Sequence, residues 1–290
     1  MNNDKILNIV ITGANGFIGD YLTKYFSSKG HQVYALVHHL YKQAPKNVKY
    51  RAFDLHSFGS DVIPDNTDIV VHAAYIPYIK SITNKNINQI ASIRLYNIAK
   101  RKKVSKFIFL SSLSASKHAI SEYGKSKFKI SKAINKETDL ILKPGLVIGN
   151  GGLYNRIETL IKNSLFVPLI GGGNQQIQYI LIDNLAKLID NSILYNITGE
   201  YNVAYKTPIK MKDLYLHITK SIDKKIILLP FPYLFADIAF GLINILKLNI
   251  GINKDNYLGL KNMKTVNICN SEDIFKVKLK PINKNWSTTN

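Results

Sequence analysis

The amino-acid sequence predicts an α/β protein built on a doubly wound parallel sheet. Short apolar runs alternate with helical stretches of about 10 to 20 residues over the first two thirds of the chain. These runs are apolar throughout, which is typical of parallel strands that are covered by helices on both faces. A chain of 290 residues with 46% hydrophobic content is long enough for one domain of ordinary size and a smaller second one.

Eight apolar runs are expected to form strands. They span residues 6–11, 33–37, 51–53, 68–72, 106–110, 139–142, 179–182 and 200–204. A helix is expected after the first strand, because five apolar residues share one stripe before Gly30: Phe17, Ile18, Tyr21, Leu22 and Tyr25. The pattern loosens after Gly149. We therefore assign residues 1–149 to the sheet domain, with residues 178–205 returning to it, and residues 150–177 and 206–290 to a substrate-binding part.

The charge balance is strongly basic, with a formal net charge of +20. Lysine supplies most of it, because the chain has only four arginines: Arg51, Arg94, Arg101 and Arg156. Recognition of phosphates and base edges favours the arginine fork, and the basic residues are spread along the whole chain. We therefore interpret the charge as a solvated lysine surface and expect no nucleic-acid partner.

Cysteine and histidine usage excludes two kinds of site. Cys269 is the sole cysteine, so neither an internal disulfide nor a cysteine-built metal site is expected. The seven histidines lack the spacing of metal ligands, so we expect no metal.

The termini and apolar runs predict a cytoplasmic protein without a transmembrane segment. Residues 1–5 are polar, residues 6–11 are too short for a signal-peptide core, and no run of 18 apolar residues occurs. Phe231–Leu248 is interpreted as a core or dimer helix in preference to an amphipathic helix on a membrane. A homodimer is therefore left open.

A glycine-rich segment follows the first strand directly and opens the first helix. Gly13, Gly16 and Gly19 have the spacing G-x-x-G-x-x-G. Gly13 would permit a tight turn, Gly16 would let the backbone approach a pyrophosphate at the positive helix end, and Gly19 would let helix and strand pack closely. The segment predicts a dinucleotide site.

The run Thr12–Gly19, TGANGFIG, resembles the fingerprint of the extended short-chain dehydrogenases/reductases, the NAD-dependent epimerase/dehydratase family. Asp54-Leu55 is similar to that family's adenine-contacting pair, and His72-Ala73-Ala74 to the loop that passes under the cofactor. Later matches are Phe107–Ser112, Lys143–Gly145, Pro168–Gly173 and Asp183–Ala186. The resemblance covers roughly residues 5–205 and implies a Rossmann-type doubly wound parallel sheet with a small C-terminal substrate-binding domain.

The resemblance also implies a set of cofactor-binding residues. In the first loop these are Asn15, Phe17 and Ile18, in addition to the three glycines. Residues after later strands complete the set: His38, Asp54, Leu55, Ala73, Ala74, Asn88, Pro144, Tyr123 and Lys127.

The end of the second strand bears on the choice between NAD and NADP. Val37 occupies the position where an NAD-specific site usually carries a carboxylate. His38, His39 and Lys42 follow, and they could bond or neutralise a 2′-phosphate. We therefore favour NADP over NAD, the alternative being an enzyme that accepts either cofactor.

Ser112, Tyr123 and Lys127 are the candidate catalytic residues. Tyr123 and Lys127 are four positions apart, which places them on the same face of a helix. A phenol has a pKa of about 10, and a nearby ammonium and the cationic nicotinamide would lower it, so Tyr123 could exchange a proton near neutral pH. The resemblance implies that Lys127 holds the cofactor ribose, that Ser112 bonds the reacting oxygen, and that Asn88 steadies the active-site helix.

The chain departs from the family pattern on the substrate side. Leu113-Ser114 replaces the Asp-Glu pair of the 4,6-dehydratases, which argues against dehydration. Gln175–Gln178 occupies the stretch where members that bind sugar nucleotides often carry an arginine for the diphosphate. Arg156 or lysines such as Lys162 would then have to hold that group.

Three functions are carried forward. The first is an NAD(P)-dependent nucleotide-sugar epimerase or 4-ketoreductase that acts in surface polysaccharide synthesis, with hydride transfer at a sugar carbon and Tyr123 as acid and base. The second is an NADPH-dependent oxidoreductase for a lipid or steroid-like alcohol or ketone, which the missing arginine favours. The third is a non-catalytic NADPH-binding assembly or regulatory protein. The nucleotide that co-purifies with the protein would discriminate, since an epimerase retains its cofactor and a reductase releases it.

Overall fold

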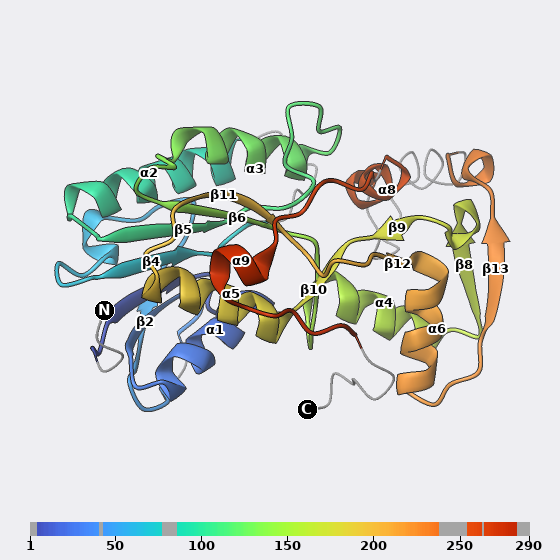
Figure 1. Cartoon of the computed structure of the whole chain (residues 1–290), viewed down its shortest axis with the longest axis horizontal. Helices are drawn as coiled ribbons and strands as arrows, with labels where there is room; N and C mark the ends of the chain where they lie inside the picture. Colours follow the sequence, from blue (N-terminus) through green and yellow to red (C-terminus); the bar gives the residue numbers. More distant parts are fainter. Residues whose placement is uncertain (1–4, 41–42, 77–85, 238–253, 263, 283–290) are drawn as a thin grey trace.

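The computed structural model describes residues 5–40, 43–76, 86–237, 254–262 and 264–282 (Figure 1). Its centre is a seven-stranded sheet in the order β11-β6-β5-β4-β1-β2-β3. The strands are β1 (Asn8–Thr12), β2 (Gln32–Val37), β3 (Val48–Ala52), β4 (Ile69–His72), β5 (Lys106–Leu110), β6 (Leu140–Pro144) and β11 (Gly199–Val203). All neighbours in this sheet run parallel. The predicted doubly wound parallel sheet is confirmed.

Helices cover both faces of this sheet. In Figure 1, α2 (Ile87–Arg101) and α3 (Glu122–Ala133) lie on one side, and α1 (Phe17–Ser28) and α5 (Ile182–Leu194) on the other. Successive residues of β1 enter opposite cores, as the two-residue period of a strand requires. Ile9 and Ile11 join Leu22 of α1 in one apolar cluster, whereas Val10 joins Leu95 of α2 in the other. Burial on both faces explains why the strands read as uninterrupted apolar runs.

The third strand begins earlier than expected. β3 starts at Val48, and its exposed residues include Lys49. β3 is the outermost strand on its side of the sheet, so polar side chains there can reach water. The Arg51 guanidinium and the Lys49 ammonium both lie over the ring of Tyr34 on β2, 5.6 and 5.7 Å from its centroid.

The smaller part of the molecule is built from two helices and three strand pairs. The helices are α4 (Gly152–Asn163) and α6 (Met211–Ser221). The pairs are β7 (Leu146–Ile148) with β10 (Tyr179–Leu181), β9 (Gln176–Ile177) with β12 (Ile209–Lys210), and β8 (Phe166–Ile170) with β13 (Ile227–Phe231). The expected strand at 179–182 is therefore present, but it lies outside the seven-stranded sheet.

The remaining elements are short. They are the 3₁₀ turns η1 (Ser60–Val62) and η3 (Gly171–Gly173), and the helices α8 (Lys254–Lys261) and α9 (Ser271–Phe275). α9 lies against α5, and Phe275 and Val277 belong to the same apolar cluster as Ile9. These contacts attach the end of the described chain to the sheet. The boundaries between the sheet domain and the substrate-binding part stay a prediction.

The segment Phe231–Leu248 is only partly within the described residues. Phe231 ends strand β13 and residues 233–237 are helical, whereas residues 238–248 lie outside the described ranges. Across the ranges that the structure describes, no helix has both the length and the apolar character needed to cross a bilayer.

Candidate active site

The glycine-rich loop packs directly against the loop that follows β4. Gly13 has a φ of 69°, and a β-carbon there would lie 2.8 Å from the Cα of Ala74. A β-carbon on Gly19 would lie 2.2 Å from the carbonyl oxygen of Gly13, so helix α1 sits tightly on the loop. Gly16 is the N-cap of α1 and has no side chain to accept from the first-turn N–H groups. Those N–H groups and the bare backbone fit the diphosphate of a dinucleotide.

Asn15 ties this loop to the end of β2. Its Oδ1 accepts from the backbone N–H of His38 at 2.8 Å, and its Nδ2 donates to the carbonyl of His39 at 3.2 Å. Both ends of the amide are therefore used by the protein. Asn15 thus holds the loop against the end of β2, and its remaining amide N–H and oxygen lone pair leave the predicted cofactor contact a prediction.

Phe17 connects the glycine loop with the smaller part of the molecule. β-carbons on Gly149 and Gly151 would lie 2.6 and 2.5 Å from atoms of Phe17. The side chain thus needs the bare backbone of the Gly149–Gly152 stretch, at which α4 begins. Ile18 is partly buried and packs on the sheet cluster below the loop. Neither side chain has a polar atom, so any contact of theirs with a cofactor is by packing.

The ends of β2 and β3 bring His38 and Asp54 together. His38 Nε2 lies 3.7 Å from Asp54 Oδ2, and the other carboxylate oxygen of Asp54 accepts from the backbone and ring of His56 at 2.9 and 2.8 Å. The hydrogen bonds from His56 lower the pKa of Asp54. Leu55 is buried among the core residues of the α2 side. His38 and Asp54 are accessible at the edge where an adenosine ribose would lie, whereas Leu55 is a core residue. Lys42 lies outside the described ranges.

A buried chain of hydrogen bonds supports the loop after β4. The hydroxyl of Thr12 accepts from the N–H groups of Ala73 and Ala74 at 3.2 and 3.1 Å. It must therefore donate to His72 Nδ1, which lies 2.7 Å away, so that His72 Nε2 donates to the hydroxyl of Ser92 at 2.7 Å. Burial lowers the pKa of His72 to about 3, which keeps the ring neutral. Sequence reasoning assigned no role to Thr12, His72 or Ser92 individually.

Asn88 holds the backbone of Ile76. Its Oδ1 accepts from the Ile76 N–H and its Nδ2 donates to the Ile76 carbonyl, both at 2.8 Å. The side chain is buried at the start of α2. Asn88 therefore braces the loop after β4 instead of the helix that carries the candidate catalytic residues.

The three candidate catalytic residues meet at the end of β5. The hydroxyl of Tyr123 is hydrogen-bonded to Ser112, whose Oγ also lies 3.0 Å from the Ser114 hydroxyl. Lys127 is buried, and its ammonium donates to the carbonyl of Leu110 at 2.7 Å. The N-cap Ser121 accepts from the N–H of Gly124 at 3.1 Å, which fixes the start of α3 and with it the first turn that carries Tyr123.

Burial dominates the protonation behaviour of this group. It raises the pKa of Tyr123, while the Ser112 hydrogen bond acts in the opposite direction. It lowers the pKa of Lys127 to about 7. The ammonium of Lys127 was expected to lower the pKa of Tyr123, but Lys127 is bonded to Leu110 and its Nζ lies 5.9 Å from the centre of the Tyr123 ring, so burial and the Ser112 hydrogen bond govern that pKa.

Tyr75 joins the two halves of the site and was missed by sequence reasoning. Its ring meets the ring of Tyr123 edge-on at 4.9 Å, and Lys127 Nζ lies 5.2 Å from its centroid. The ring of Phe109 lies on another side of the same ammonium, at 4.8 Å. The position of Tyr75 directly after the Ala73-Ala74 loop is the signal that could have suggested it.

Pro144 lies at the end of β6, and the residues expected to hold a diphosphate, Arg156 and Lys162, lie on helix α4. The carbonyl of Pro144 accepts from the N–H of Leu113, which shapes the end of β6. Arg156 is an exposed residue of α4, and Lys162 lies near that helix's far end, roughly 15 Å from Gly152 at 1.5 Å per residue. Lys162 therefore lies at the opposite end of α4 from Gly152, and a role for it or for Arg156 in holding a diphosphate stays a prediction.

Gln175 and Gln178, in the stretch where an arginine was expected, form hydrogen bonds with backbone groups of neighbouring segments. Gln175 Nε2 donates to the carbonyl of Ile170 and the hydroxyl of Tyr233, both at 2.6 Å. Gln178 exchanges hydrogen bonds with the backbone of Val266 at 2.7 and 2.9 Å. These side chains stabilise the smaller part and offer no cationic group for a diphosphate.

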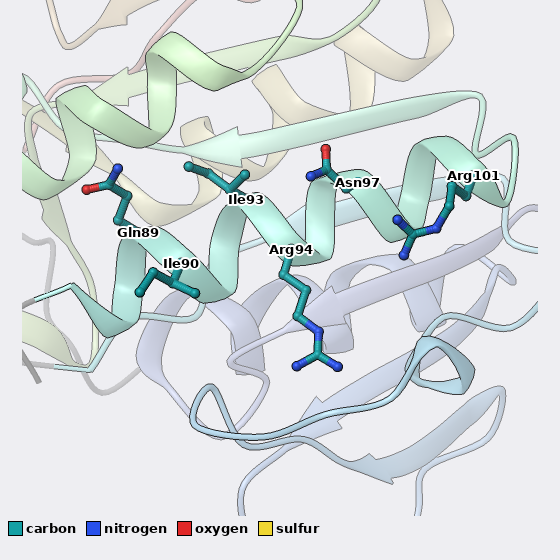
Figure 2. A pocket seen from close by; sticks show the side chains of 6 residues that line it. All are labelled: Gln89, Ile90, Ile93, Arg94, Asn97 and Arg101. Carbon is teal, nitrogen blue, oxygen red and sulfur yellow. The ribbon is translucent and has the colours of Figure 1, made fainter.

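A hollow along α2 lies away from this group. Figure 2 shows its lining, which comes from one solvent-facing side of the helix: Gln89, Ile90, Ile93, Arg94, Asn97 and Arg101. The guanidinium of Arg94 lies 4.8 Å from the centre of the Phe58 ring. None of the predicted site residues lines this hollow. Among the described residues, no three His, Cys, Asp or Glu side chains gather closely enough to hold a metal ion.

The parallel sheet with its strand reversal beside β1, and the glycine loop at that point, define a dinucleotide-binding α/β protein. The chain belongs to the NAD dependent epimerase/dehydratase family, whose model matches residues 9–204. This match confirms the family that the sequence motifs indicated. NAD(P)-dependent chemistry is the activity type of that family.

Relatives by sequence and by structure agree with the family. Epimerase family protein YfhF of Bacillus subtilis (strain 168) is 24% identical over 272 residues, covering 83% of this chain and 88% of the relative. A UDP-N-acetylglucosamine 4-epimerase from Methanobrevibacter ruminantium M1, solved with UDP-N-acetylmuramic acid, is similar with a TM-score of 0.68 and 19% identity, covering 79% of this chain and 86% of that one. A UDP-glucuronic acid 4-epimerase from Bacillus cereus, solved with NAD, has a TM-score of 0.67 and 18% identity, covering 78% and 87%.

Proposed function

We propose that the protein is an NAD(P)-dependent epimerase or 4-ketoreductase of nucleotide sugars, with Tyr123 as the acid and base. The observation that carries the proposal is the continuity of the site. Gly13 contacts Ala74, the next residue Tyr75 contacts Tyr123, and Lys127 lies beside both rings. A cofactor on the glycine loop would therefore end beside the candidate catalytic group.

The residues of the chain would divide the work as follows. A nicotinamide cofactor, when bound, would supply hydride acceptance and return. The Tyr123 hydroxyl takes a proton from, or returns it to, the oxygen on the same substrate carbon, and the Ser112 hydroxyl bonds that oxygen. Ser112 is hydrogen-bonded to Tyr123, so both hydroxyls face one point.

Lys127 would act through its charge. Its ammonium is bonded to the Leu110 carbonyl and lies among the rings of Tyr75, Phe109 and Tyr123. Aromatic faces favour a cation, which partly offsets the burial that lowers its pKa to about 7. The protein alone raises the pKa of Tyr123. The positive nicotinamide of the oxidised cofactor would act in the opposite direction and favour the phenolate of Tyr123.

The substrate class is supported by the solved relatives, several of which are UDP-sugar 4-epimerases. The chain lacks an arginine at residues 175–178, and the side-chain amides of Gln175 and Gln178 donate to backbone carbonyls. A bidentate guanidinium clamp is not replaced by lysine without loss. We therefore expect weak and salt-sensitive binding of UDP- or dTDP-sugars. A role in surface polysaccharide synthesis is part of the same proposal.

NADP is the cofactor that we propose. Val37 ends β2 without a carboxylate, and the exposed His38 and His39 follow it. Asp54 is the nearest acid to His38, at 3.7 Å, and it is hydrogen-bonded to His56. A 2′-phosphate at the end of β2 would therefore lie beside imidazoles that can donate to it, and Asp54 would be the one carboxylate beside His38 among the described residues.

The test begins with the purified protein. Denaturation releases any retained nucleotide, which chromatography identifies, and turnover is then measured on UDP- and dTDP-sugars with NAD⁺, NADH, NADP⁺ and NADPH. Interconversion of two sugars without net change in cofactor identifies an epimerase, and stoichiometric NADPH oxidation identifies a reductase. Calorimetry with UDP and dTDP at low and high salt measures the affinity for the nucleotide part of the substrate and its dependence on ionic strength.

Two results would contradict the proposal. The absence of binding to any nucleoside diphosphate at low salt would favour the non-nucleotide substrate. Tight NADPH binding without turnover on a broad panel of sugars, alcohols and ketones would favour the non-catalytic alternative.

A further inference from the structure

The strand pair β8–β13 has an apolar outer face. Four exposed positions share this face: Phe166 and Pro168 on β8, and Ile227 and Leu229 on β13. Pro230 is exposed as well, with the opposite strand parity. The intervening Val167 points the other way, into the core between α4 and α6. A strand with one face on a core normally presents polar residues to water on the other. These four positions depart from that rule together.

The strand register makes the four residues one surface. Ile227 pairs with Phe166, and Leu229 pairs with Pro168. Phe166, Ile227 and Leu229 are 57%, 55% and 46% exposed. The N–H of Ile227 donates to the carbonyl of Leu165 at 2.8 Å, and Leu165 is 67% exposed, so the surface extends past the start of both strands.

At the other end the same face runs into a short helical turn. Phe231 has the same strand parity as Leu229 and packs with Tyr233 and Ala236. Phe235 lies beside Phe231, with ring centroids 6.3 Å apart. Seven residues form what we name the tip patch: Leu165, Phe166, Pro168, Ile227, Leu229, Leu234 and Phe235. It holds six of the 14 large apolar side chains that are exposed within the described ranges, so its exposure is concentrated and not scattered.

Lysines border the tip patch where its strands begin. Lys162 precedes β8 at the end of α4, and Lys224 and Lys225 precede β13. Lys224 Nζ donates to the carbonyl of Lys162, which places the two loops side by side. None of the ion pairs found among the described residues involves these three lysines, and Asp223 is the one acid in the loop before β13.

We propose that the tip patch docks the protein on an anionic lipid surface. Apolar side chains would enter the boundary between headgroups and acyl chains, while Lys162, Lys224 and Lys225 meet the anionic headgroups. The pair β8–β13 stands at the end of the molecule away from the seven-stranded sheet (Figure 1), so a flat surface can reach it. The net charge of +20 supports the approach to such a surface.

A second copy of the chain fits this patch less well. Two tip patches face to face would bring two sets of unpaired lysines together. Pairing of strand edges is hindered as well, since Pro168 and Pro230 have no N–H to donate. The inference is independent of the proposed enzymatic function, since it uses none of the candidate catalytic or cofactor-binding residues.

The experiment is vesicle flotation of the full chain. Vesicles of phosphatidylcholine are compared with vesicles that also contain phosphatidylglycerol, at about 0.1 M salt. One variant combines Phe166→Ser, Ile227→Asn and Leu229→Ser. A second combines Lys162→Gln, Lys224→Gln and Lys225→Gln. A charge-matched control combines Lys46→Gln, Lys129→Gln and Lys278→Gln, all exposed and outside the patch.

The wild type should float with the anionic vesicles and not with the neutral ones. The apolar variant and the patch-lysine variant should each reduce binding by about tenfold or more, and the control variant by less than about twofold. Thermal unfolding checks that the apolar variant is folded. If it is not, the test of the inference rests on the lysine variants and on a double variant, Leu165→Ser with Leu234→Ser.

Three outcomes would overturn the inference. The first is no flotation of the wild type. The second is an equal loss in the control and the patch-lysine variants, which would mean general adhesion of a basic protein. The third is a wild-type dimer in sedimentation velocity that the apolar variant dissociates, together with unchanged vesicle binding, which would assign the patch to contacts between copies.

Discussion

The ring of Tyr75 stands edge-on against the ring of Tyr123, with centroids 4.9 Å apart and an interplanar angle of 86°. Tyr75 follows the loop that Gly13 touches, and Tyr123 opens the helix that carries Lys127. The contact therefore joins the glycine-rich loop of β1 to the hydroxyl and ammonium groups of α3. Edge-to-face pairs of this kind are worth about 0.5–1.5 kcal/mol beyond the area that they bury.

Tyr123→Phe should reduce turnover on a confirmed substrate by roughly 10²- to 10⁴-fold, the usual contribution of a general acid or base. The ring contact with Tyr75 is retained in this variant, so binding of NAD(P)H, followed by fluorescence, should be unchanged. Tyr195→Phe removes the hydroxyl of an exposed tyrosine and is the matched control. Full activity of Tyr123→Phe would rule out proton transfer by this residue.

Lys127→Met should remove a pH dependence of stability. Burial lowers the pKa of Lys127 to about 7, against 10.5 as the ordinary value, so between these pH values the unfolded chain binds more protons. The free energy of unfolding of the wild type should therefore rise with pH in this range, relative to Lys127→Met, by up to about 1.4 kcal/mol per pH unit.

Urea unfolding at several pH values between about 7 and 10 measures this difference. Lys129→Met lies on the exposed side of the same helix and serves as control. A difference between the wild type and Lys127→Met that stays constant with pH would mean that Lys127 keeps its proton in the folded protein.

Gly13→Ala should abolish cofactor binding and destabilise the fold. Its φ is 69°, and the new β-carbon would lie 2.8 Å from Ala74. Gly30→Ala is the matched control, because Gly30 also has a positive φ of 87° but no atom within 4 Å of the new β-carbon. It should cost about 1 kcal/mol of backbone strain and leave binding intact. Equal binding by both variants would show that the contact with Ala74 is dispensable.

His72→Leu should remove a loss of stability in acid. The folded-state pKa of about 3 lies below the ordinary value of 6.5, so the unfolded chain binds the extra proton between these values. Wild-type stability should fall as the pH drops from about 6.5 towards 3, by up to about 1.4 kcal/mol per unit more than in the variant. At neutral pH the variant should itself be less stable by about 1–3 kcal/mol, because the Thr12 and Ser92 hydroxyls lose their partner.

The control for His72 is Ser92→Ala. This variant removes a hydrogen bond and keeps the titrating ring, so it should lower stability without removing the acid dependence. Unfolding by urea across the pH range distinguishes the two variants. Equal slopes for the wild type and His72→Leu would contradict the buried neutral histidine.

His38→Asp should shift cofactor preference towards NADH. Val37 is buried in the core cluster, so His38 is the first exposed position after β2. A carboxylate there would accept from ribose hydroxyls and repel a 2′-phosphate. We expect the wild type to bind NADPH more tightly and the variant to bind NADH more tightly, each by about tenfold, which is 1.4 kcal/mol. His38→Asn tests shape without charge. Wild-type binding of NADH that is tighter by tenfold would refute the NADP preference.

Much of the fold is local in origin and was predictable. β5 was expected at 106–110 and is found at Lys106–Leu110, because a strand buried on both faces must be apolar throughout. The glycine loop was predictable because its φ and its close contacts exclude side chains at fixed spacing. Tyr123 and Lys127 were placed on one face of α3 by helical period alone.

The sequence alone therefore determined the doubly wound sheet, the glycine-rich loop and the helical spacing of Tyr123 and Lys127, since each follows from patterns over neighbouring positions. Only the tertiary structure decided that Tyr75 meets Tyr123 and that Lys127 bonds Leu110. It also decided that the apolar strand β13 has its face in water. These relationships join residues that are distant along the chain, and a side chain's burial and partners follow from what packs against it, which no local pattern contains.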